Sequence, residues 1–361
     1  MRTIGKQQIE DMSVGAAVLG AGGGGDPYVG KLMALQAVEE FGEVTLLDVD
    51  EVPDDVMVAS ANMIGAPTVL VEKIPSGTEL QNAFDHVSKA LGQKVFGVIP
   101  FEAGGINSML PLVLAASNNL PLIDADGMGR AFPEIQMVTW SLQDIPCTPA
   151  CVCDEKGNCV SVTAKDNVWA ERLCRNATAV MGGSCYMSCY PMTGKQMKAS
   201  SIRGTTTKSE TIGRVIREAK SKKLDPLAAL KEVTGGIELF RGKIIDVNRN
   251  TVGGFVRGET ELDGLEGYKG SRLKISFQNE NLVAIRDDGT ILCTVPDLII
   301  MLDLEATLPV TTETLKYGAR VVVLGIPCSP LWRSERGISV VGPGYFGYPD
   351  IPYIPVEERN K

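Results

Sequence analysis

Histidine is almost absent from this sequence, which contains only His86 among its 361 residues. A single histidine excludes sites built on two or more histidines, which include most catalytic zinc centres. Clusters of basic residues are also lacking, because the lysines and arginines are scattered and the formal net charge is -9. Nucleic acids and anionic membrane surfaces require a basic stripe, so we expect neither as a partner.

Long apolar runs and an export signal are missing as well. No uncharged apolar run approaches the roughly 18 residues that a membrane span requires. Glu10 and Asp11 interrupt the N-terminal segment before any apolar stretch, unlike the layout of a secretory signal. These features predict a cytoplasmic protein.

The nine cysteines are irregularly spaced and form no C-x-x-C pair. In a chain without an export signal they are expected to be reduced thiols. We therefore expect no structural zinc on the cluster Cys147, Cys151, Cys153 and Cys159. Residues 151–159, "CVCDEKGNC", predict two short strands around a turn. No cofactor is expected, although a divalent metal at carboxylate groups stays open.

The length of the chain favours two domains. Residues 44–124 alternate between predicted strands (44–50, 56–65, 94–100 and 120–124) and predicted helices (78–92 and 104–119). This alternation predicts a largely parallel sheet covered by helices. We place this N-terminal α/β domain at residues 1–165.

The pattern changes after about residue 162. Two helical stretches (167–182 and 209–233) precede short strands separated by turn signals (238–250, 253–262, 272–286, 290–302 and 319–327). Residues 166–361 are therefore predicted to form a strand-rich α+β domain, mainly antiparallel. The overall fold class is α/β.

A glycine run, "GAGGGGDP", occupies residues 20–27. Its first glycines match G-x-G-x-x-G, but the preceding segment is typical of a helix, whereas a dinucleotide site follows a strand. Asp26 and Pro27 predict an N-cap and first residue of a helix. Three readings stay open: an anion-binding backbone, a tight turn between helices, or a dinucleotide site. The first would use Gly22, Gly23, Gly24, Gly25 and Asp26.

Residues 122–137, "LIDADGMGRAFPEIQM", are the strongest candidate for a catalytic segment. Asp124, Asp126 and Glu134 lie near Arg130, just beyond a predicted strand. Crowded carboxylates can diverge in pKa and divide the roles of base and acid. Arg130 could hold a substrate carboxylate through two hydrogen bonds. The alternative is a solvated loop in which Arg130 bridges the acids.

Two further segments follow predicted strands. Residues 102–107 contain Glu102, Gly104, Gly105 and Asn107, and residues 61–67 contain Asn62. In parallel sheets ligands bind beyond the carboxyl ends of the strands. We therefore predict one pocket where segments 22–27, 61–67, 102–107 and 124–134 converge. Residues 278–281, "QNEN", predict a hairpin turn.

Six motifs occur in this order: "GAGGGGDP", "DADGMGRAFPE", "GFVRGE", "QNEN", "VPDLI" and "VGPGYFGY". On these motifs the chain resembles the S-methyl thiohydantoin desulfurase-like family over nearly its whole length. Members of that family are associated with hydantoinase and oxoprolinase proteins. The resemblance implies hydrolysis of a small cyclic thiohydantoin acid to a hydantoin and methanethiol.

The residues suit that reaction, which needs a base, an acid and a clamp for the substrate carboxylate. Asp124 or Asp126 would be the base, Glu134 or Glu102 the acid, and Arg130 with the glycine backbone the clamp. The expected partners are a small-molecule carboxylate, further copies of the chain, and a hydantoinase or oxoprolinase protein. Two alternatives are a nucleotide-dependent enzyme that uses the glycine loop and a non-catalytic subunit of a hydantoinase-type complex. No G-x-x-x-x-G-K-[ST] loop supports the first.

Overall fold

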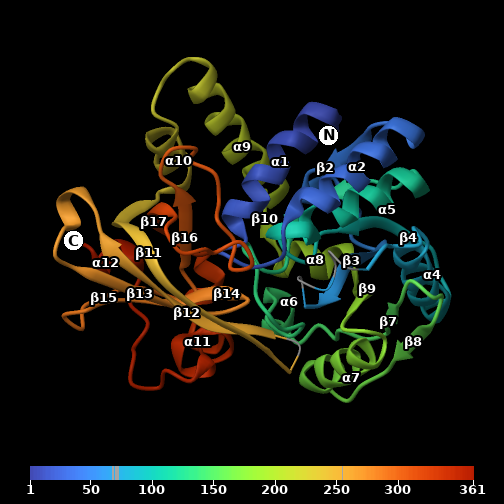
Figure 1. Cartoon of the computed structure of the whole chain (residues 1–361). Coiled ribbons are helices and arrows are strands. Elements are labelled where there is room, and N and C mark those ends of the chain that lie inside the picture. The colour runs from blue at the N-terminus through green and yellow to red at the C-terminus, as the bar shows by residue number, and fades with distance from the viewer. Residues whose placement is uncertain (67–68, 70–72, 254) are drawn as a thin grey trace.

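The computed structural model describes residues 1–361 except 67–68, 70–72 and 254. Pro67, at the end of the predicted pocket segment 61–67, lies outside the described residues. Figure 1 shows two sheets, one in the half of the molecule that holds the N-terminus and one near the C-terminus. None of the helices formed by the described residues is long and apolar enough to cross a membrane.

The first sheet has eight strands in the order β1-β2-β5-β4-β3-β9-β7-β8. Its centre is parallel, as predicted: β2 (Val44–Leu47), β5 (Leu122–Ile123), β4 (Val95–Ile99) and β3 (Met57–Gly65). Four antiparallel strands extend it: β1 (Arg2–Ile4), β9 (Ser184–Thr193), β7 (Ala150–Cys153) and β8 (Cys159–Val162). Strand β9 follows residue 165 in the chain and still pairs with β3, so the first sheet draws on both sequence halves.

Helices cover both faces of this sheet because its central strands are apolar on both sides. On β3, Val58 belongs to one core cluster, whereas Ala59 and Ala61 belong to the other. The second cluster also contains residues of α1 (Lys6–Leu19), α2 (Pro27–Phe41), α4 (Glu79–Leu91) and α5 (Leu110–Asn118). The first contains Ala170 and Cys174 of α7 (Asn167–Val180).

The second sheet has seven strands, all antiparallel, in the order β15-β14-β13-β12-β11-β17-β16. This confirms the prediction of a strand-rich, antiparallel second half. The strands are β11 (Ile237–Val252), β12 (Phe255–Gly264), β13 (Arg272–Gln278), β14 (Glu280–Arg286), β15 (Ile291–Thr294), β16 (Leu298–Asp303) and β17 (Arg320–Ile326).

Short elements complete the chain. They include β6 (Ala125–Asp126), which pairs with β10 (Ile202–Arg203), and the helices α6 (Thr139–Leu142), α8 (Gly194–Ser200), α10 (Pro226–Thr234), α11 (Glu335–Val341) and α12 (Val356–Arg359). The 3-10 turns are η1 (Val49–Glu51), η2 (Gly105–Ser108), η3 (Glu266–Tyr268), η4 (Pro330–Arg333) and η5 (Pro343–Phe346).

Helix α9 (Thr205–Ser221) packs closely on α1 through two glycines. A Cβ atom at Gly15 would lie 1.8 Å from the Ser209 carbonyl oxygen, and one at Gly213 would lie 1.9 Å from that of Asp11. Arg217 also donates to both carboxylate oxygens of Asp11, at 2.7 and 2.8 Å. The helix that precedes the glycine run is therefore held by a helix from the other half of the sequence.

Replacement of Gly15 by alanine should destabilise the fold by about 3 kcal/mol or more, because the methyl group meets backbone atoms that cannot move aside. At a solvent-exposed helical position the same change stabilises by up to about 1 kcal/mol. Gly267→Ala is the control, because nothing lies within 4 Å of its added Cβ. Urea denaturation should separate the two variants, and equal free energies of unfolding would contradict this packing.

Candidate active site

One cavity lies where several strand ends and loops meet. The carboxyl ends of β3 and β4 lie side by side because these strands are parallel neighbours. Each of the four predicted pocket segments contributes to its lining. The lining residues are Gly24, Asn62, Met63, Ile64, Gly65, Phe101, Glu102, Asn107, Phe132, Pro133, Glu134, Ile135, Arg175, Asn279 and Glu280.

The glycine run connects α1 to α2. The side chain of Asp26 accepts a hydrogen bond from the Tyr28 amide at 2.9 Å, and Pro27 is the first helical residue, so the predicted N-cap is confirmed. The run follows a helix, which differs from the strand that precedes a dinucleotide-binding loop.

The bare backbone of this loop accommodates side chains and backbone of the protein itself. A Cβ atom at Gly23 would lie 2.2 Å from Oε1 of Glu280, and one at Gly22 would lie 2.6 Å from Nδ2 of Asn281. The Gly24 amide donates to Glu280 Oε1 at 3.1 Å. The carboxyl group bound by the backbone of this loop is therefore the side chain of Glu280.

The loop also packs against the segment after β4. The Gly24 carbonyl accepts from the Ile106 amide at 3.0 Å, and a Cβ atom at Gly105 would lie 2.0 Å from that same carbonyl oxygen. A Cβ atom at Gly104 would lie 2.8 Å from Cα of Gly20. Of the glycines predicted to bind substrate, Gly24 lines the cavity, whereas Gly22, Gly23, Gly25, Gly104 and Gly105 are outside its lining.

Glu280 reaches the loop from the β13–β14 hairpin, which confirms that "QNEN" forms a hairpin turn. Asn279 occupies the turn with φ of +58°, a left-handed conformation that asparagine tolerates. Its Oδ1 accepts from the Val256 amide at 2.8 Å, and its carbonyl accepts from Thr312 Oγ1 at 2.8 Å. The sequence analysis did not include Glu280 among the candidate site residues. The feature that could have identified it is an acidic residue flanked by amide side chains between two apolar strands.

Two buried carboxyl groups, Glu102 and Glu280, line the cavity. Burial raises the pKa of Glu280 to about 8, while the positive charge of Arg130 opposes that rise. Burial also raises the pKa of Glu102 well above its usual value, and the nearby carboxyl of Glu280 raises it further. Among the described residues, Oε2 of each glutamate has no hydrogen-bond partner. Both groups can therefore be protonated at neutral pH and offer an oxygen to a ligand.

Asn107 fixes the orientation of Glu102. Its Nδ2 donates to Glu102 Oε1 at 2.6 Å, while its Oδ1 accepts from the Met63 amide at 2.6 Å. A second bond runs from Asn107 Nδ2 to the Met63 carbonyl at 3.2 Å. The predicted residues Glu102 and Asn107 thus form one buried unit with the end of β3.

Polar groups of different character line another part of the cavity. Glu134 accepts a hydrogen bond from the hydroxyl of Tyr345 at 2.7 Å and another from Gln136. Arg175 of α7 donates to the Pro133 carbonyl at 3.0 Å, is paired with Glu171, and lies over the Phe255 ring at 4.4 Å. Arg175 is the arginine in the cavity lining.

The two aspartates predicted as bases lie outside the lining. Asp124 accepts from the Thr207 amide at 3.0 Å, in the first turn of α9. Asp126 is buried, and its two oxygens accept from the Gly129 amide at 2.9 and 2.8 Å. Burial raises the pKa of Asp126 to about 7, and its proximity contributes to the raised pKa of Glu102. Asp126 is thus a neighbour of the cavity.

Arg130 is also buried and outside the lining. It donates to the carbonyls of Ala131, Pro296 and Asp297 at 2.9, 2.8 and 2.9 Å, and its guanidinium lies over Phe132 at 4.6 Å. The alternative reading of its segment as a solvated loop is wrong, because Asp126 and Arg130 are both fully buried. The positive charge of Arg130 lowers the pKa of Glu280 and so favours its ionised form.

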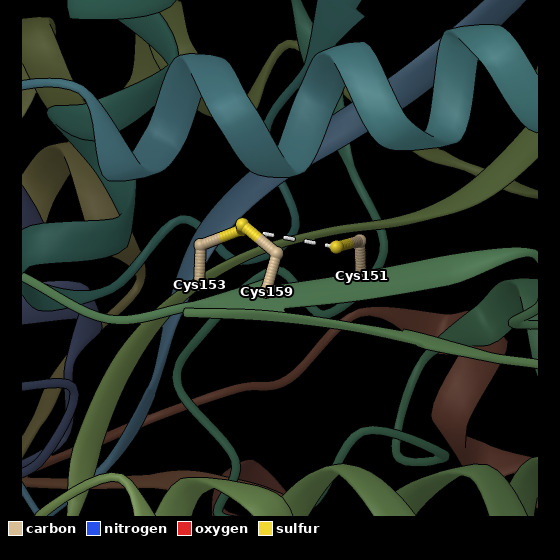
Figure 2. Close-up of side chains that lie close together, drawn as sticks. All are labelled: Cys151, Cys153 and Cys159. Carbon is tan, nitrogen blue, oxygen red and sulfur yellow. Dashed lines mark hydrogen bonds between the residues drawn. A yellow bond between two sulfur atoms is a disulfide. The ribbon is translucent and has the colours of Figure 1, made fainter. Parts of the chain in front are cut away.

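Two cysteines depart from the expectation of reduced thiols. Cys153 and Cys159 form a disulfide, because they face each other directly across the predicted β7–β8 hairpin (Figure 2). The other seven cysteines are free and buried. Cys147 packs in a different core cluster from Cys151 and Cys153, so the four-cysteine set considered from the sequence is not assembled.

Fold and site together define a protein with a parallel-centred α/β half and an antiparallel β-rich half that share one acidic cavity. A crystal structure of a protein from Chromobacterium violaceum has the same fold, with a TM-score of 0.80, 22% identity, and coverage of 99% of this chain and 100% of that chain. A comparison with curated proteins gave no match.

Family models identify the chain further. The S-Me-THD-like N-terminal domain matches residues 7–164, and the S-Me-THD-like C-terminal domain matches residues 165–356. The chain belongs to the S-methyl thiohydantoin desulfurase-like family.

The raised pKa of Glu280 predicts a specific pH dependence of stability. The folded state keeps this carboxyl protonated up to about pH 8, whereas the unfolded chain ionises it near 4.5. The free energy of unfolding therefore falls as pH rises between these values. Glu280→Gln keeps the acceptor for Gly24 and removes the ionisation. The variant should gain roughly 2–4 kcal/mol relative to wild type between pH 5 and 8.

Urea denaturation at several pH values measures this gain. Glu358→Gln is the control, because it removes a solvent-exposed carboxyl, and its pH dependence should match that of wild type. A difference between Glu280→Gln and wild type that stays constant from pH 5 to 8 would rule out a protonated Glu280.

Proposed function

We propose that this protein is a hydrolase that converts a small S-methyl thiohydantoin acid to the hydantoin and methanethiol. The observation that carries the proposal is the pair Glu102 and Glu280, two buried carboxyl groups that line one cavity with a free oxygen each. Membership of the S-methyl thiohydantoin desulfurase-like family supports the substrate class.

The reaction requires both a base and an acid. Water adds to the ring carbon that bears the methylthio group, so a C–O bond forms while a base removes one proton. The C–S bond then breaks, and methanethiolate takes a proton to leave as methanethiol. The ring carbon becomes a carbonyl, and the nitrogen of the former C=N bond gains the second proton of the water, so atoms and charge balance without a cofactor.

The environments of the two glutamates suggest how they divide these roles. Arg130 and the Gly24 amide favour the ionised form of Glu280, so it loses its proton more readily. Glu102 has no cation among the main influences on its pKa and is held by Asn107. We assign Glu280 as the base and Glu102 as the acid, because environments that separate two pKa values separate these roles.

Other lining residues would bind and orient the substrate. Phe101, Phe132 and Met63 provide apolar contacts for the ring and the methylthio group. Arg175 would hold the side-chain carboxylate, the role expected from the sequence for Arg130. Burial of Arg130 against backbone carbonyls leaves it to act on Glu280 instead.

Kinetics with a carboxylate-bearing S-methyl thiohydantoin test the proposal by measuring thiol release. Glu280→Gln and Glu102→Gln should each lower kcat by roughly a hundred- to ten-thousandfold, the usual effect of losing a general base or acid. Asp124→Asn, outside the cavity, is the matched control and should retain turnover. In wild type, kcat/KM should rise with pH up to about 8, as Glu280 ionises.

In the same assay Arg175→Lys should mainly raise KM, by about ten- to hundredfold, because lysine keeps the charge but loses the planar fork. Near-wild-type turnover in folded Glu280→Gln and Glu102→Gln would remove both residues from the mechanism. Failure of the wild-type protein to release thiol from a series of such substrates would overturn the proposed function.

A further inference from the structure

Three cysteines lie on one face of the β7–β8 hairpin, away from the acidic cavity. Cys151 and Cys153 are two residues apart on β7, so their side chains share a face. Cys159 pairs with Cys153 across the hairpin, and Ser161 pairs with Cys151. Helix α4 covers this face with Ala83 and Val87, which belong to the same core cluster as Cys151 and Cys153. Figure 2 shows the three sulfurs beneath that helix.

The spacing of these sulfurs suits a metal ion. All three lie within 4.8 Å of one another, and the Sγ atoms of Cys151 and Cys153 are 3.8 Å apart. Metal–sulfur bonds of about 2.3 Å in a trigonal plane separate the sulfurs by about 4.0 Å. The sulfurs of Cys153 and Cys159 are bonded to each other, so after reduction their side chains would rotate apart to reach this spacing, while the hairpin backbone keeps all three thiols on one face.

A thiol-exchange role fits the cluster less well. The attacking species in disulfide exchange is the thiolate. Cys151 is buried beneath helix α4, so a disulfide substrate has poor access to its sulfur. A soft metal ion, by contrast, displaces the thiol proton when it binds.

We propose that Cys151, Cys153 and Cys159, once the Cys153–Cys159 disulfide is reduced, form a three-sulfur site for one Cu(I) ion. Soft thiolate ligands favour Cu(I), whereas structural zinc prefers four ligands. In the part of the chain that the structure describes, the group of potential ligands comprises these three residues only. The disulfide is then the form of the protein that does not bind the ion.

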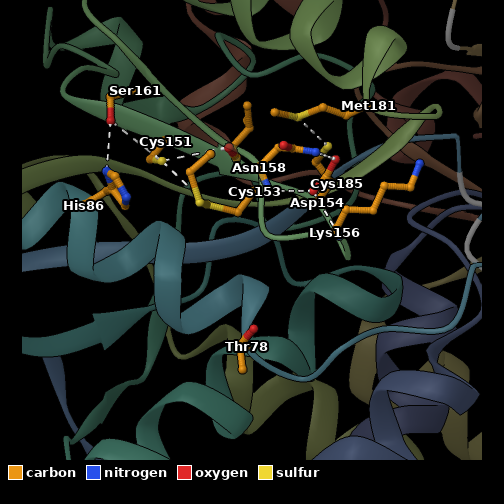
Figure 3. Close-up of a disulfide and its surroundings, with 12 residues drawn as sticks. Thr78, His86, Cys151, Cys153, Asp154, Lys156, Asn158, Ser161, Met181 and Cys185 are labelled. Atoms are coloured by element: carbon orange, nitrogen blue, oxygen red, sulfur yellow. Dashed lines mark hydrogen bonds between the residues drawn. A yellow bond between two sulfur atoms is a disulfide. The ribbon is translucent and has the colours of Figure 1, made fainter.

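His86 lies near the cluster but is separated from it by Ser161. The Ser161 hydroxyl is 3.2 Å from His86 Nδ1 and 3.9 Å from the Sγ of Cys151 (Figure 3). The imidazole is therefore outside the set of three ligands as the structure stands. A tetrahedral Cys₃His zinc site would require His86 to displace Ser161, which makes zinc the less favoured ion.

Cys159 is partly exposed, so a small reductant can reach the disulfide from the side of the hairpin. Cys153 lines a small hollow together with Lys73, Glu79, Glu155 and Cys185. The redox step balances with a thiol reductant: two small thiols are oxidised to one disulfide, and Cys153 and Cys159 each gain one hydrogen. Cu(I) then replaces thiol protons, which are released to solvent.

The test uses the whole protein, reduced with a phosphine and kept without oxygen, and titrated with Cu(I) in competition with a coloured Cu(I) chelator. Reduced wild type should bind about one ion per chain. The same protein before reduction should bind none at this site, a comparison that needs no variant. Cys151→Ser should weaken binding by about hundredfold or more, since even residues that only support metal ligands can cost that much.

Cys293→Ala is the matched control, because Cys293 is a buried free cysteine on β15 in the second sheet. It should bind Cu(I) as wild type does. Equal affinities for the oxidised and reduced wild-type protein would overturn the proposal. So would unchanged binding in Cys151→Ser, or stoichiometric Zn(II) binding in preference to Cu(I).

Discussion

The side chain of Glu280 links the two halves of the chain, because its carboxyl lies against the backbone of Gly23 and Gly24. This contact needs glycine on one side and a tight hairpin on the other. It brings a carboxyl of the antiparallel sheet beside Glu102, which follows a strand of the parallel-centred sheet. The burial that results raises the pKa of both groups. The acidic cavity therefore depends on the docking of one hairpin on one loop.

Much of the fold could be predicted from local patterns. Alternation of apolar strands and amphipathic helices predicted the parallel centre of the first sheet, and Asp26 with Pro27 predicted the start of α2. Strand β9 was missed as a member of that sheet because its pairing with β3 joins residues about 130 positions apart. The Cys153–Cys159 bond was missed for a different reason, since compartment and composition argued for reduced thiols.

The sequence predicted the location of the site better than the residues that would carry out the reaction. Asn62 lies in the last part of β3, and Glu102 and Asn107 follow β4, so the rule that ligands bind at the carboxyl ends of parallel strands placed all three in the cavity lining. Asp126 and Arg130 also follow a strand, but their side chains turn to backbone groups of their own surroundings. Glu280 comes from a hairpin more than 150 residues after Glu102 in the chain. No local sequence pattern predicts which surface such a hairpin packs against.

Carbon-13 NMR of protein labelled at the glutamate carboxyl carbons tests the protonated state of the cavity most directly. The account predicts two glutamate signals that titrate well above the ordinary value of about 4.3, one of them near pH 8. The signal near pH 8 should disappear in Glu280→Gln, and the remaining high signal should titrate at lower pH because the charge beside Glu102 is gone. Titration of every glutamate signal near the ordinary value would contradict the account.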